Sequence, residues 1–156
     1  MVKIRQANQD DRERLALVKS YWGNETAEII ISRRLRQTQQ GKGAYLVAET
    51  DNLIVGHVFL KFFGKETAPD YPDIEDLYVQ EAFRRQGIAT ALLQQCEAIS
   101  RSKGFGLIGL AAGVDETGPE RMLYRRLGYV LTGDKPYVDA VYNGVEDWVV
   151  NMKKAI

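Results

Sequence analysis

The sequence predicts a mixed α/β domain in which amphipathic helices pack on a sheet. Three observations predict this class. Residues 73–103 have the pattern of a strand, a glycine-containing turn and a helix, and residues 44–63 have the pattern of two strands joined by a polar turn. Apolar residues three and four apart mark further helices. At 156 residues the chain has the length of one domain, and we expect residues 1–156 to share a single core.

The charge balance argues against a nucleic-acid binder. Twenty-one basic residues match 21 acidic ones, and neither sign forms a long run. We therefore expect a small-molecule or peptide substrate and no nucleic-acid partner. The single cysteine, Cys96, excludes an intrachain disulfide, and neither a signal-peptide pattern nor an apolar run of membrane-spanning length is present. A cytoplasmic protein without membrane contact is the expectation.

The N-terminal segment is expected to form a short strand and two helices. Residues 2–6 alternate apolar and polar side chains, as a half-buried strand does. A helix follows over residues 8–23, capped by the asparagine at its start. A second helix begins at Asn24 or Thr26 and ends before Gly41.

Two β-rich segments come next. Residues 44–49 and 53–63 are separated by a short polar turn, which predicts a hairpin. His57, the only histidine, lies on the second strand. We interpret it as a histidine on a solvated strand face, although its ordinary pKa would also suit a general base. No second histidine or cysteine lies near it in sequence, so no metal site is expected. Residues 64–72 form a loop that could fold over a site.

The next strand, residues 73–79, carries an irregularity. Its inward-facing candidates Ile74 and Leu77 are three residues apart, whereas a regular strand repeats every two. A β-bulge between them would restore the inward face and leave main-chain groups unpaired. Such groups could hold a ligand that lies along the strand.

The turn after this strand predicts an anion site. A chain that leaves a strand, turns at Gly87 and enters a helix aims several N–H groups and the positive end of the helix dipole at one point. Gly87 also lets a ligand approach without meeting a Cβ atom. Arg84 and Arg85 add positive charge beside the amides. These features suit a pyrophosphate.

The helix that follows is expected to end at Lys103 and Gly104. Ile88, Leu92 and Cys96 recur at intervals of four and define its buried stripe. Cys96 therefore reads as a buried, inert thiol rather than a nucleophile.

The C-terminal third is expected to add strands around one short helix. A strand over residues 105–112 carries glycines at its start and middle, which suggests close approach of another backbone or a ligand. A helix from Pro119 to Gly128 follows, with Met122, Leu123 and Leu127 as its apolar face. Residues 129–132 and 146–152 read as the last two strands, with residues 133–144 as a long connection between them.

Two motifs together resemble a known family. Arg84-x-x-Gly87-x-Ala89, after the acidic and apolar run of residues 73–79, resembles the acetyl-CoA signature of the GNAT superfamily of N-acetyltransferases. Residues 122–129 (Met-Leu-Tyr-Arg-Arg-Leu-Gly-Tyr) resemble that family's leucine–tyrosine helix with its glycine–aromatic end. The resemblance covers roughly residues 45–129. It implies a mixed, mostly antiparallel sheet of about six or seven strands, a bulged signature strand and about four flanking helices.

The resemblance also implies a reaction and residue roles. Members of the family transfer an acetyl group from acetyl-CoA directly to a primary amine, here of a small molecule or a peptide. Glu75 is the first candidate for the base that takes the amine's proton, with Asp73 and Asp76 as rivals. Tyr124 matches the family's tyrosine that meets the sulfur of coenzyme A and is the candidate general acid. Family members often form homodimers, so a homodimer is compatible with this reading.

The expected cofactor contacts follow the two motifs, and two positions depart from the family pattern. Thr117 stands in place of the usual asparagine and Glu120 in place of the usual alanine. Thr117 retains a hydrogen-bonding hydroxyl, so a weakened contact is expected rather than a lost one. No metal is expected. The residues expected to bind the cofactor are Leu77, Tyr78, Val79, Arg84, Arg85, Gln86, Gly87, Ile88, Ala89, Thr90, Thr117 and Tyr124.

Alternatives stay open at this level. The chain could be a catalytically silent acyl-CoA-binding or sensing module, which the changes at residues 117 and 120 would suit. A nucleotide phosphate-binding protein is a weaker alternative, because neither GxxxxGK[ST] nor GxGxxG is present.

Several side chains have two readings each. Tyr21, Trp22 and Glu25 either contact the acceptor or serve as core aromatics and a helix-cap carboxylate. Residues 137, 139 and 142 either line the acceptor site or lie on the surface of a loop.

Overall fold

The computed structural model describes residues 1–18, 25–66 and 68–156. Tyr21 and Trp22 lie outside these ranges. Two short 3₁₀ turns, Gln9–Asp11 and Glu81–Phe83, accompany the main elements. The strands and helices are β1 (Lys3–Gln6), α1 (Arg12–Ala16), α2 (Ala27–Gln39), β2 (Gly43–Thr50), β3 (Leu53–Lys61), β4 (Asp73–Val79), α3 (Ile88–Ser102), β5 (Leu107–Gly113), α4 (Pro119–Arg126), β6 (Val130–Leu131), β7 (Tyr137–Tyr142) and β8 (Val145–Ala155).

The eight strands formed by the described residues make one mixed sheet. Its order is β1-β2-β3-β4-β5-β8-β6, with β7 also paired to β8. All neighbours are antiparallel except β4 and β5, which are parallel. The predicted fold class is confirmed, with one strand more than expected.

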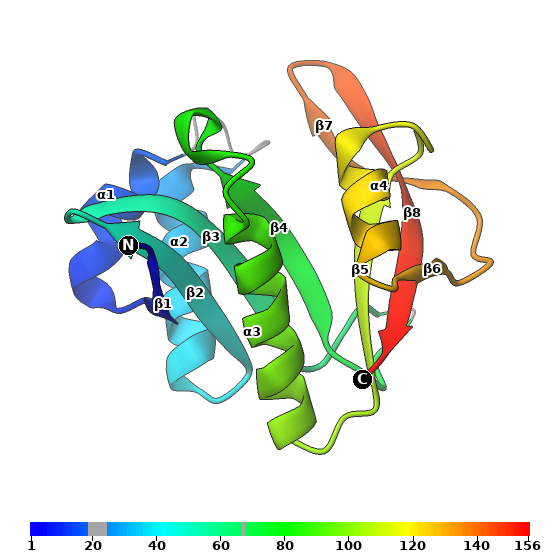
Figure 1. Ribbon diagram of the computed structural model, residues 1–156, viewed down its shortest axis with the longest axis horizontal. Coiled ribbons are helices and arrows are strands. Elements are labelled where there is room, and N and C mark those ends of the chain that lie inside the picture. Colours follow the sequence, from blue (N-terminus) through cyan, green and yellow to red (C-terminus); the bar gives the residue numbers. More distant parts are fainter. Residues whose placement is uncertain (19–24, 67) are drawn as a thin grey trace.

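Two apolar layers cover the sheet. Helices α1 and α2 lie on one face, and α3 lies on the other, with α4 beside β5 (Figure 1). Strand β2 shows why both layers form: Leu46 faces the cluster that includes α3, while Tyr45 and Val47 face the cluster that includes α1 and α2. A strand covered on both faces buries a continuous apolar run instead of alternating.

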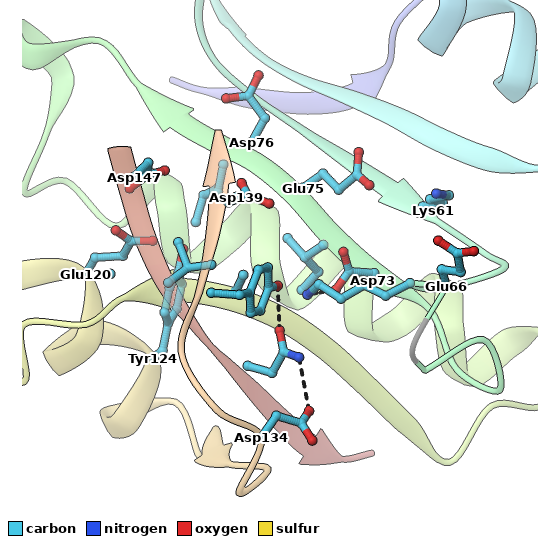
Figure 2. Close-up of a pocket in the computed structure, with 18 of the residues that line it drawn as sticks. Lys61, Glu66, Asp73, Glu75, Asp76, Glu120, Tyr124, Asp134, Asp139 and Asp147 are labelled. Carbon is cyan, nitrogen blue, oxygen red and sulfur yellow. Dashed lines mark hydrogen bonds and ion pairs between the residues drawn. The ribbon is translucent and has the colours of Figure 1, made fainter. Parts of the chain in front are cut away.

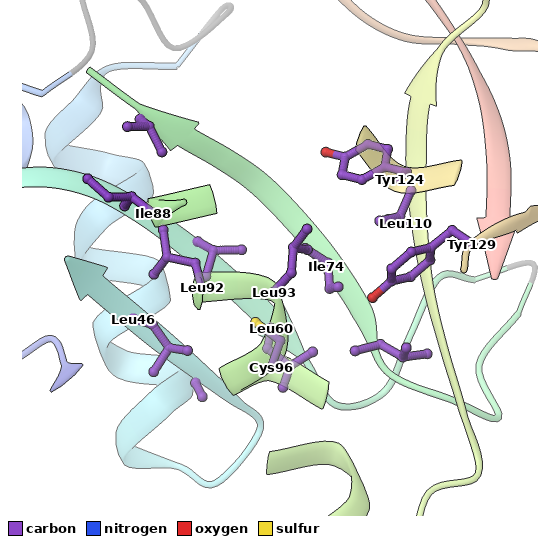
Figure 3. Close-up of a cluster of buried hydrophobic side chains, with 14 of the residues drawn as sticks. Leu46, Leu60, Ile74, Ile88, Leu92, Leu93, Cys96, Leu110, Tyr124 and Tyr129 are labelled. Atoms are coloured by element: carbon purple, nitrogen blue, oxygen red, sulfur yellow. The ribbon is translucent and has the colours of Figure 1, made fainter. Parts of the chain in front are cut away.

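The core on the α3 side confirms the predicted helix stripe. Ile88, Leu92 and Cys96 are buried, and Figure 3 shows them packed against the sheet. Burial raises the pKa of the Cys96 thiol far above its usual value, which makes it a poor nucleophile at neutral pH. The same cluster extends across the sheet to Tyr124 and Tyr129.

The sheet opens between its two halves. Strands β4 and β5 pair only at Asp73 with Gly109 and at Ile74 with Leu110. Beyond these pairs the strands diverge, and Figure 1 shows the opening between them. This divergence leaves main-chain groups of β4 facing the gap.

The long connection expected over residues 133–144 is wrong, because β7 lies within it. Residues 137–142 pair antiparallel with β8 through a tight turn at Asn143 and Gly144, whose φ angles are +50° and +79°. Asn-Gly is the strongest hairpin signal in a sequence. The run before it is short and contains Asp139, which obscures the strand pattern.

Two predicted exposures are also wrong. His57 is completely buried rather than solvated, because β3 is covered on both faces. Met122 is 49% exposed, whereas Arg121 and Tyr124 are the buried side chains of α4. Arg121 and Tyr124 are three residues apart and share one face of α4, whereas Met122 is rotated by about 100° from Arg121.

The expected helices differ in smaller ways. The capped first helix is a 3₁₀ turn followed by the short α1, with Asn8 and Asp11 forming a reciprocal cap. Helix α2 begins after Thr26, whose hydroxyl accepts a hydrogen bond from the Ile29 N–H. Among the glycines near β5, only Gly109 lies under another group, the Tyr71 ring.

Candidate active site

The predicted bulge lies in the middle of β4. Glu75 pairs with Phe59 and Tyr78 pairs with His57, so two residues of β4 oppose one residue of β3. The first of the two, Asp76, has a left-handed φ of +54°. Asparagine and aspartate tolerate this conformation better than most residues. The extra residue interrupts the ladder and turns main-chain N–H groups away from regular pairing.

The glycine turn joins this strand to α3. Arg85 and Gly87 have φ angles of +62° and +79°, and Gly87 is the N-cap of α3. A Cβ atom on Gly87 would have no atom within 4 Å, so the space in front of the helix is open. The first N–H groups of a helix have no acceptor within the helix. The turn therefore has the geometry of an anion site.

Arg84 holds the turn against the strand. Its Nε donates a hydrogen bond to the Val79 carbonyl at 2.8 Å, and its guanidinium lies 5.5 Å from the centre of the Tyr78 ring. Arg84 thus positions the turn as well as adding charge to it. Arg85 is exposed at the same corner.

A cleft of about 900 Å³ opens beside β4. Elements β4, β5, α4, β7 and β8 contribute to its wall, so it lies in the gap between the two halves of the sheet (Figure 2). Its lining is strongly acidic: the described residues contribute eight carboxylates and four cationic side chains. The carboxylates belong to Glu66, Asp73, Glu75, Asp76, Glu120, Asp134, Asp139 and Asp147.

The structure distinguishes the three candidate bases. Asp73 is buried, and its Oδ1 lies 2.8 Å from the Lys65 ammonium. Burial raises the pKa of Asp73 to about 6 despite that ion pair. Asp76 is paired with Arg34 at 2.9 Å. Glu75 is half-buried in the same cleft and forms no ion pair with any described residue.

Tyr124 lies on the opposite wall of the cleft. Its side chain comes from α4 and is 4% exposed. Burial, and then the neighbouring Glu120 carboxylate, raises the pKa of the Tyr124 phenol far above its usual value. The phenol therefore carries its proton at neutral pH. Figure 2 shows Glu120 and Tyr124 on the same side of the cleft.

Thr117 lies outside the cleft lining. Its main-chain N–H and its hydroxyl both donate to Asp115 Oδ1, at 3.0 and 2.8 Å, in the exposed turn before α4. Its expected cofactor contact stays a prediction.

The β7–β8 hairpin brings residues to the cleft that sequence reasoning left undecided or missed. Tyr137, Asp139 and Tyr142 line it, which decides between the two readings of these positions in favour of the cleft. The Tyr137 hydroxyl donates to Asn151 Oδ1 at 2.7 Å. Asp147 and Asn151 were missed, because alternation along β8 does not reveal which face the cleft occupies.

The cleft lining also includes two residues, from α2 and from the loop before β4, that were not predicted from the sequence. Arg34 of α2 and Lys65 of the loop before β4 line it. No signal in the sequence couples either cation to its acidic partner in β4. Across the ranges that the structure describes, no group of side chains has the arrangement of a metal site, and none of the helices is long and apolar enough to span a membrane.

Comparisons with known proteins bear on this arrangement. Solved structures share the fold at low sequence identity. An N-acetyltransferase from Staphylococcus aureus Mu50 superposes with a TM-score of 0.79 at 16% identity, over 99% of this chain and 98% of the other. The yncA protein of Salmonella typhimurium, solved with its cofactor acetyl-CoA, gives a TM-score of 0.78 at 16% identity, over 99% and 94%. The paia N-acetyltransferase of Thermoplasma acidophilum, in complex with coenzyme A, gives 0.70 at 18% identity, over 100% and 99%.

The sequence comparisons give two results. A search of curated protein sequences finds no match. The model of the acetyltransferase (GNAT) family matches residues 5–129, a span that contains the bulged strand, the glycine turn and the leucine–tyrosine helix. The chain belongs to the GNAT family of acetyltransferases.

Proposed function

We propose that this chain is an N-acetyltransferase that moves an acetyl group from acetyl-CoA directly to a primary amine of a small molecule or a peptide. The observation that carries the proposal is the continuity of the site. The open, glycine-capped start of α3 adjoins a bulged strand, and that strand forms one wall of an acidic cleft. Each part suits one part of the reaction.

The residues of the turn suit the diphosphate of coenzyme A. Helix N–H groups from Gly87 to Thr90 supply hydrogen bonds, and the exposed Arg85 supplies charge. A Cβ at residue 87 would project into the open space that the diphosphate would need. Two structural neighbours were solved with acetyl-CoA or coenzyme A, which supports the same donor here.

The cleft suits a cationic acceptor. A primary alkylamine has a pKa of about 10.4 and arrives protonated at neutral pH. The excess of carboxylates over cationic side chains in the described lining would attract it. The same excess would disfavour an acidic acceptor.

The proposed chemistry assigns one task to each group. Glu75 takes a proton from the bound ammonium, because it lies in the cleft without an ion-pair partner among the described residues. Main-chain N–H groups near Leu77 and Tyr78, displaced by the bulge, face the carbonyl oxygen as it gains negative charge. Tyr124, which lines the cleft, donates its proton to the departing thiolate. Acetyl-CoA, when bound, supplies the activated thioester.

Thiol release tests the proposal. The protein is mixed with acetyl-CoA and pools of amines, and free coenzyme A is followed with a thiol reagent. We expect amine-dependent release and an acetylated amine by mass spectrometry. Tight binding of acetyl-CoA by calorimetry without turnover across broad pools would instead support a silent acyl-CoA-binding module. Binding of ATP or NAD in competition with coenzyme A would support a nucleotide phosphate site.

A further inference from the structure

An ion pair couples helix α2 to the bulge of β4. Arg34 Nη1 donates to Asp76 Oδ2 at 2.9 Å, and the two side chains are only 11% and 14% exposed. Arg34 lies outside the two motifs that mark the family in this sequence. The pair is therefore a contact between distant segments at the centre of the proposed site.

Aromatic rings hold the Arg34 guanidinium in place. Its central carbon lies 5.6 Å from the ring centres of both Tyr45 and Phe59. Phe59 is the β3 residue that pairs with Glu75, immediately before the bulge. Arg34 thus contacts the bulged residue and the ladder position that precedes it.

The ladder position after the bulge contacts the same carboxylate. His57 pairs with Tyr78, and its Nδ1 lies 4.0 Å from Asp76 Oδ2. The His57 ring is fully buried and stacks on Tyr78 with ring centres 5.9 Å apart. The Asp76 carboxylate therefore lies near His57 of the pair after the bulge, and its partner Arg34 lies over Phe59 of the pair before it.

The bulge needs such support. A left-handed residue costs roughly 1–2 kcal/mol relative to the right-handed conformation, and a regular ladder would pair more main-chain groups. Without the bulge, Glu75 and Leu77, which are two residues apart, would also point to the same face of β4, whereas in the bulged strand Leu77 packs against the cluster that includes α3. A fixed contact at Asp76 selects the bulged register over these alternatives.

We propose that Arg34 is a positioning residue, which sets the bulge of β4 by holding Asp76 and thereby aims the main-chain N–H groups of Leu77 and Tyr78 at the acyl-transfer cleft. The catalytic part of this inference, the effect of Arg34 on acetyl transfer, rests on the proposed function. Its structural part, that Arg34 maintains the left-handed residue at position 76, stands independently. The coenzyme A diphosphate would bind at a different place, the start of α3, so the two steps are separable by measurement.

Four variants and a control test the proposal. Arg34→Met removes the charge and keeps much of the side-chain length. Arg34→Lys keeps the charge without the planar fork. Asp76→Asn removes the charge while keeping the tolerance for a left-handed backbone. The Arg34→Met/Asp76→Asn double variant completes a double-mutant cycle. Arg33→Met is the matched control: Arg33 lies on α2 beside Arg34, and its exposed ion pair is with Glu25, which precedes the helix.

Kinetics and coenzyme A affinity provide the first readout. We expect Arg34→Met to lower kcat by up to about 100-fold, the scale of losing one oxyanion donor, with the calorimetric Kd for coenzyme A unchanged. Arg34→Lys should recover part of kcat, and the double variant should lose no more than the worse single variant. Arg33→Met should behave as wild type, because exposed ion pairs contribute little. Additive losses in the cycle would mean that Arg34 acts on the acceptor itself, and would overturn the proposal.

A backbone measurement provides the second readout and does not depend on turnover. The three-bond HN–Hα coupling of residue 76 reports its φ angle in folded protein. We expect it to change toward the extended value in Arg34→Met and to stay unchanged in Arg33→Met. A left-handed residue 76 in folded Arg34→Met would overturn the proposal. Absence of turnover in the wild type would overturn the proposed function, while the coupling would still decide whether Arg34 sets the bulge.

Discussion

Single backbone conformations define the candidate site at the scale of residues. Asp76 and Gly87 both have left-handed φ angles, one at the bulge and the other at the start of α3. The glycine was foreseeable, because only glycine enters this region without a steric penalty. The conformation of Asp76 was foreseeable only as a break in alternation. Which neighbouring carboxylates would form ion pairs was not foreseeable, because Arg34 and Lys65 come from other segments of the chain.

Gly87→Ala tests the open space in front of α3. The added Cβ would face the proposed diphosphate site, so we expect a loss of coenzyme A affinity of about tenfold or more, comparable to losing one charge-assisted hydrogen bond. Gly41→Ala is the control, because Gly41 also has a left-handed φ, +73°, with no atom within 4 Å of its Cβ position. Both variants should lose about 1 kcal/mol of stability from backbone strain. Calorimetry should show weaker binding for Gly87→Ala alone, and equal affinities would contradict the assignment.

Asp73→Asn tests the buried carboxylate through the pH dependence of stability. The pKa of Asp73 is about 6 in the fold, above its ordinary value of 3.8, mainly because of burial. The folded state therefore holds this proton more tightly than the unfolded state. The stabilising contribution is present below about pH 4 and is lost as the pH rises through about 6.

Asp73→Asn has no such proton to lose. From about pH 4 to pH 7, the unfolding free energy of the wild type should fall relative to the variant by up to roughly 3 kcal/mol, at 1.36 kcal/mol per pKa unit. Urea titrations at several pH values measure this difference. A difference that rises with pH would show that Lys65 outweighs burial and holds the pKa of Asp73 low.

At the scale of elements, a buried carboxylate and its two hydrogen-bond donors join the two halves of the sheet. Strands β4 and β5 share only two residue pairs, so the halves have little main-chain connection there. Glu97 of α3 compensates: it accepts a hydrogen bond from the Tyr129 hydroxyl at 3.0 Å and from Lys154 Nζ at 2.9 Å. Its side chain is 6% exposed. Helix α3, on one half, is thereby tied to β8 on the other.

Tyr129→Phe should weaken this connection. The substitution removes one donor from a buried carboxylate, and we expect a loss of about 1–3 kcal/mol in the free energy of unfolding, measured by urea denaturation. Tyr137→Phe, which removes a hydroxyl bonded to the neutral amide of Asn151, should cost less. Equal costs would indicate that Glu97 does not depend on Tyr129.

At the scale of the whole molecule, charge is balanced overall but unevenly placed. The chain has no formal net charge at pH 7, yet carboxylates exceed cationic side chains two to one in the described lining of the cleft. Composition alone predicts only that no nucleic acid binds. The acidic character of the cleft arises because β4, α4 and the β7–β8 hairpin bring separate acids together (Figure 2).

Salt should reveal this uneven placement. For amines that the enzyme accepts, KM should rise with ionic strength, and more steeply for a diamine than for a monoamine, because salt screens charges beyond about 10 Å at 0.1 M. Initial rates at saturating acetyl-CoA separate this effect from coenzyme A binding. A KM that is independent of salt for both amines would contradict an electrostatic role for the cleft.

The sequence by itself determined the features that depend on residues close together in the chain. These are the glycine turn at the start of α3, the bulge in β4, the β2–β3 hairpin and the family motifs. Local conformation and short-range periodicity carry these features, so a single chain segment is enough to specify them. The tertiary structure alone decided that His57 is buried, that Arg34 pairs with Asp76 and that Asp147 lines the cleft. Each of these depends on which strands pair and which face of the sheet is covered. The segments in contact are far apart in the sequence, and no local pattern in either segment specifies its partner.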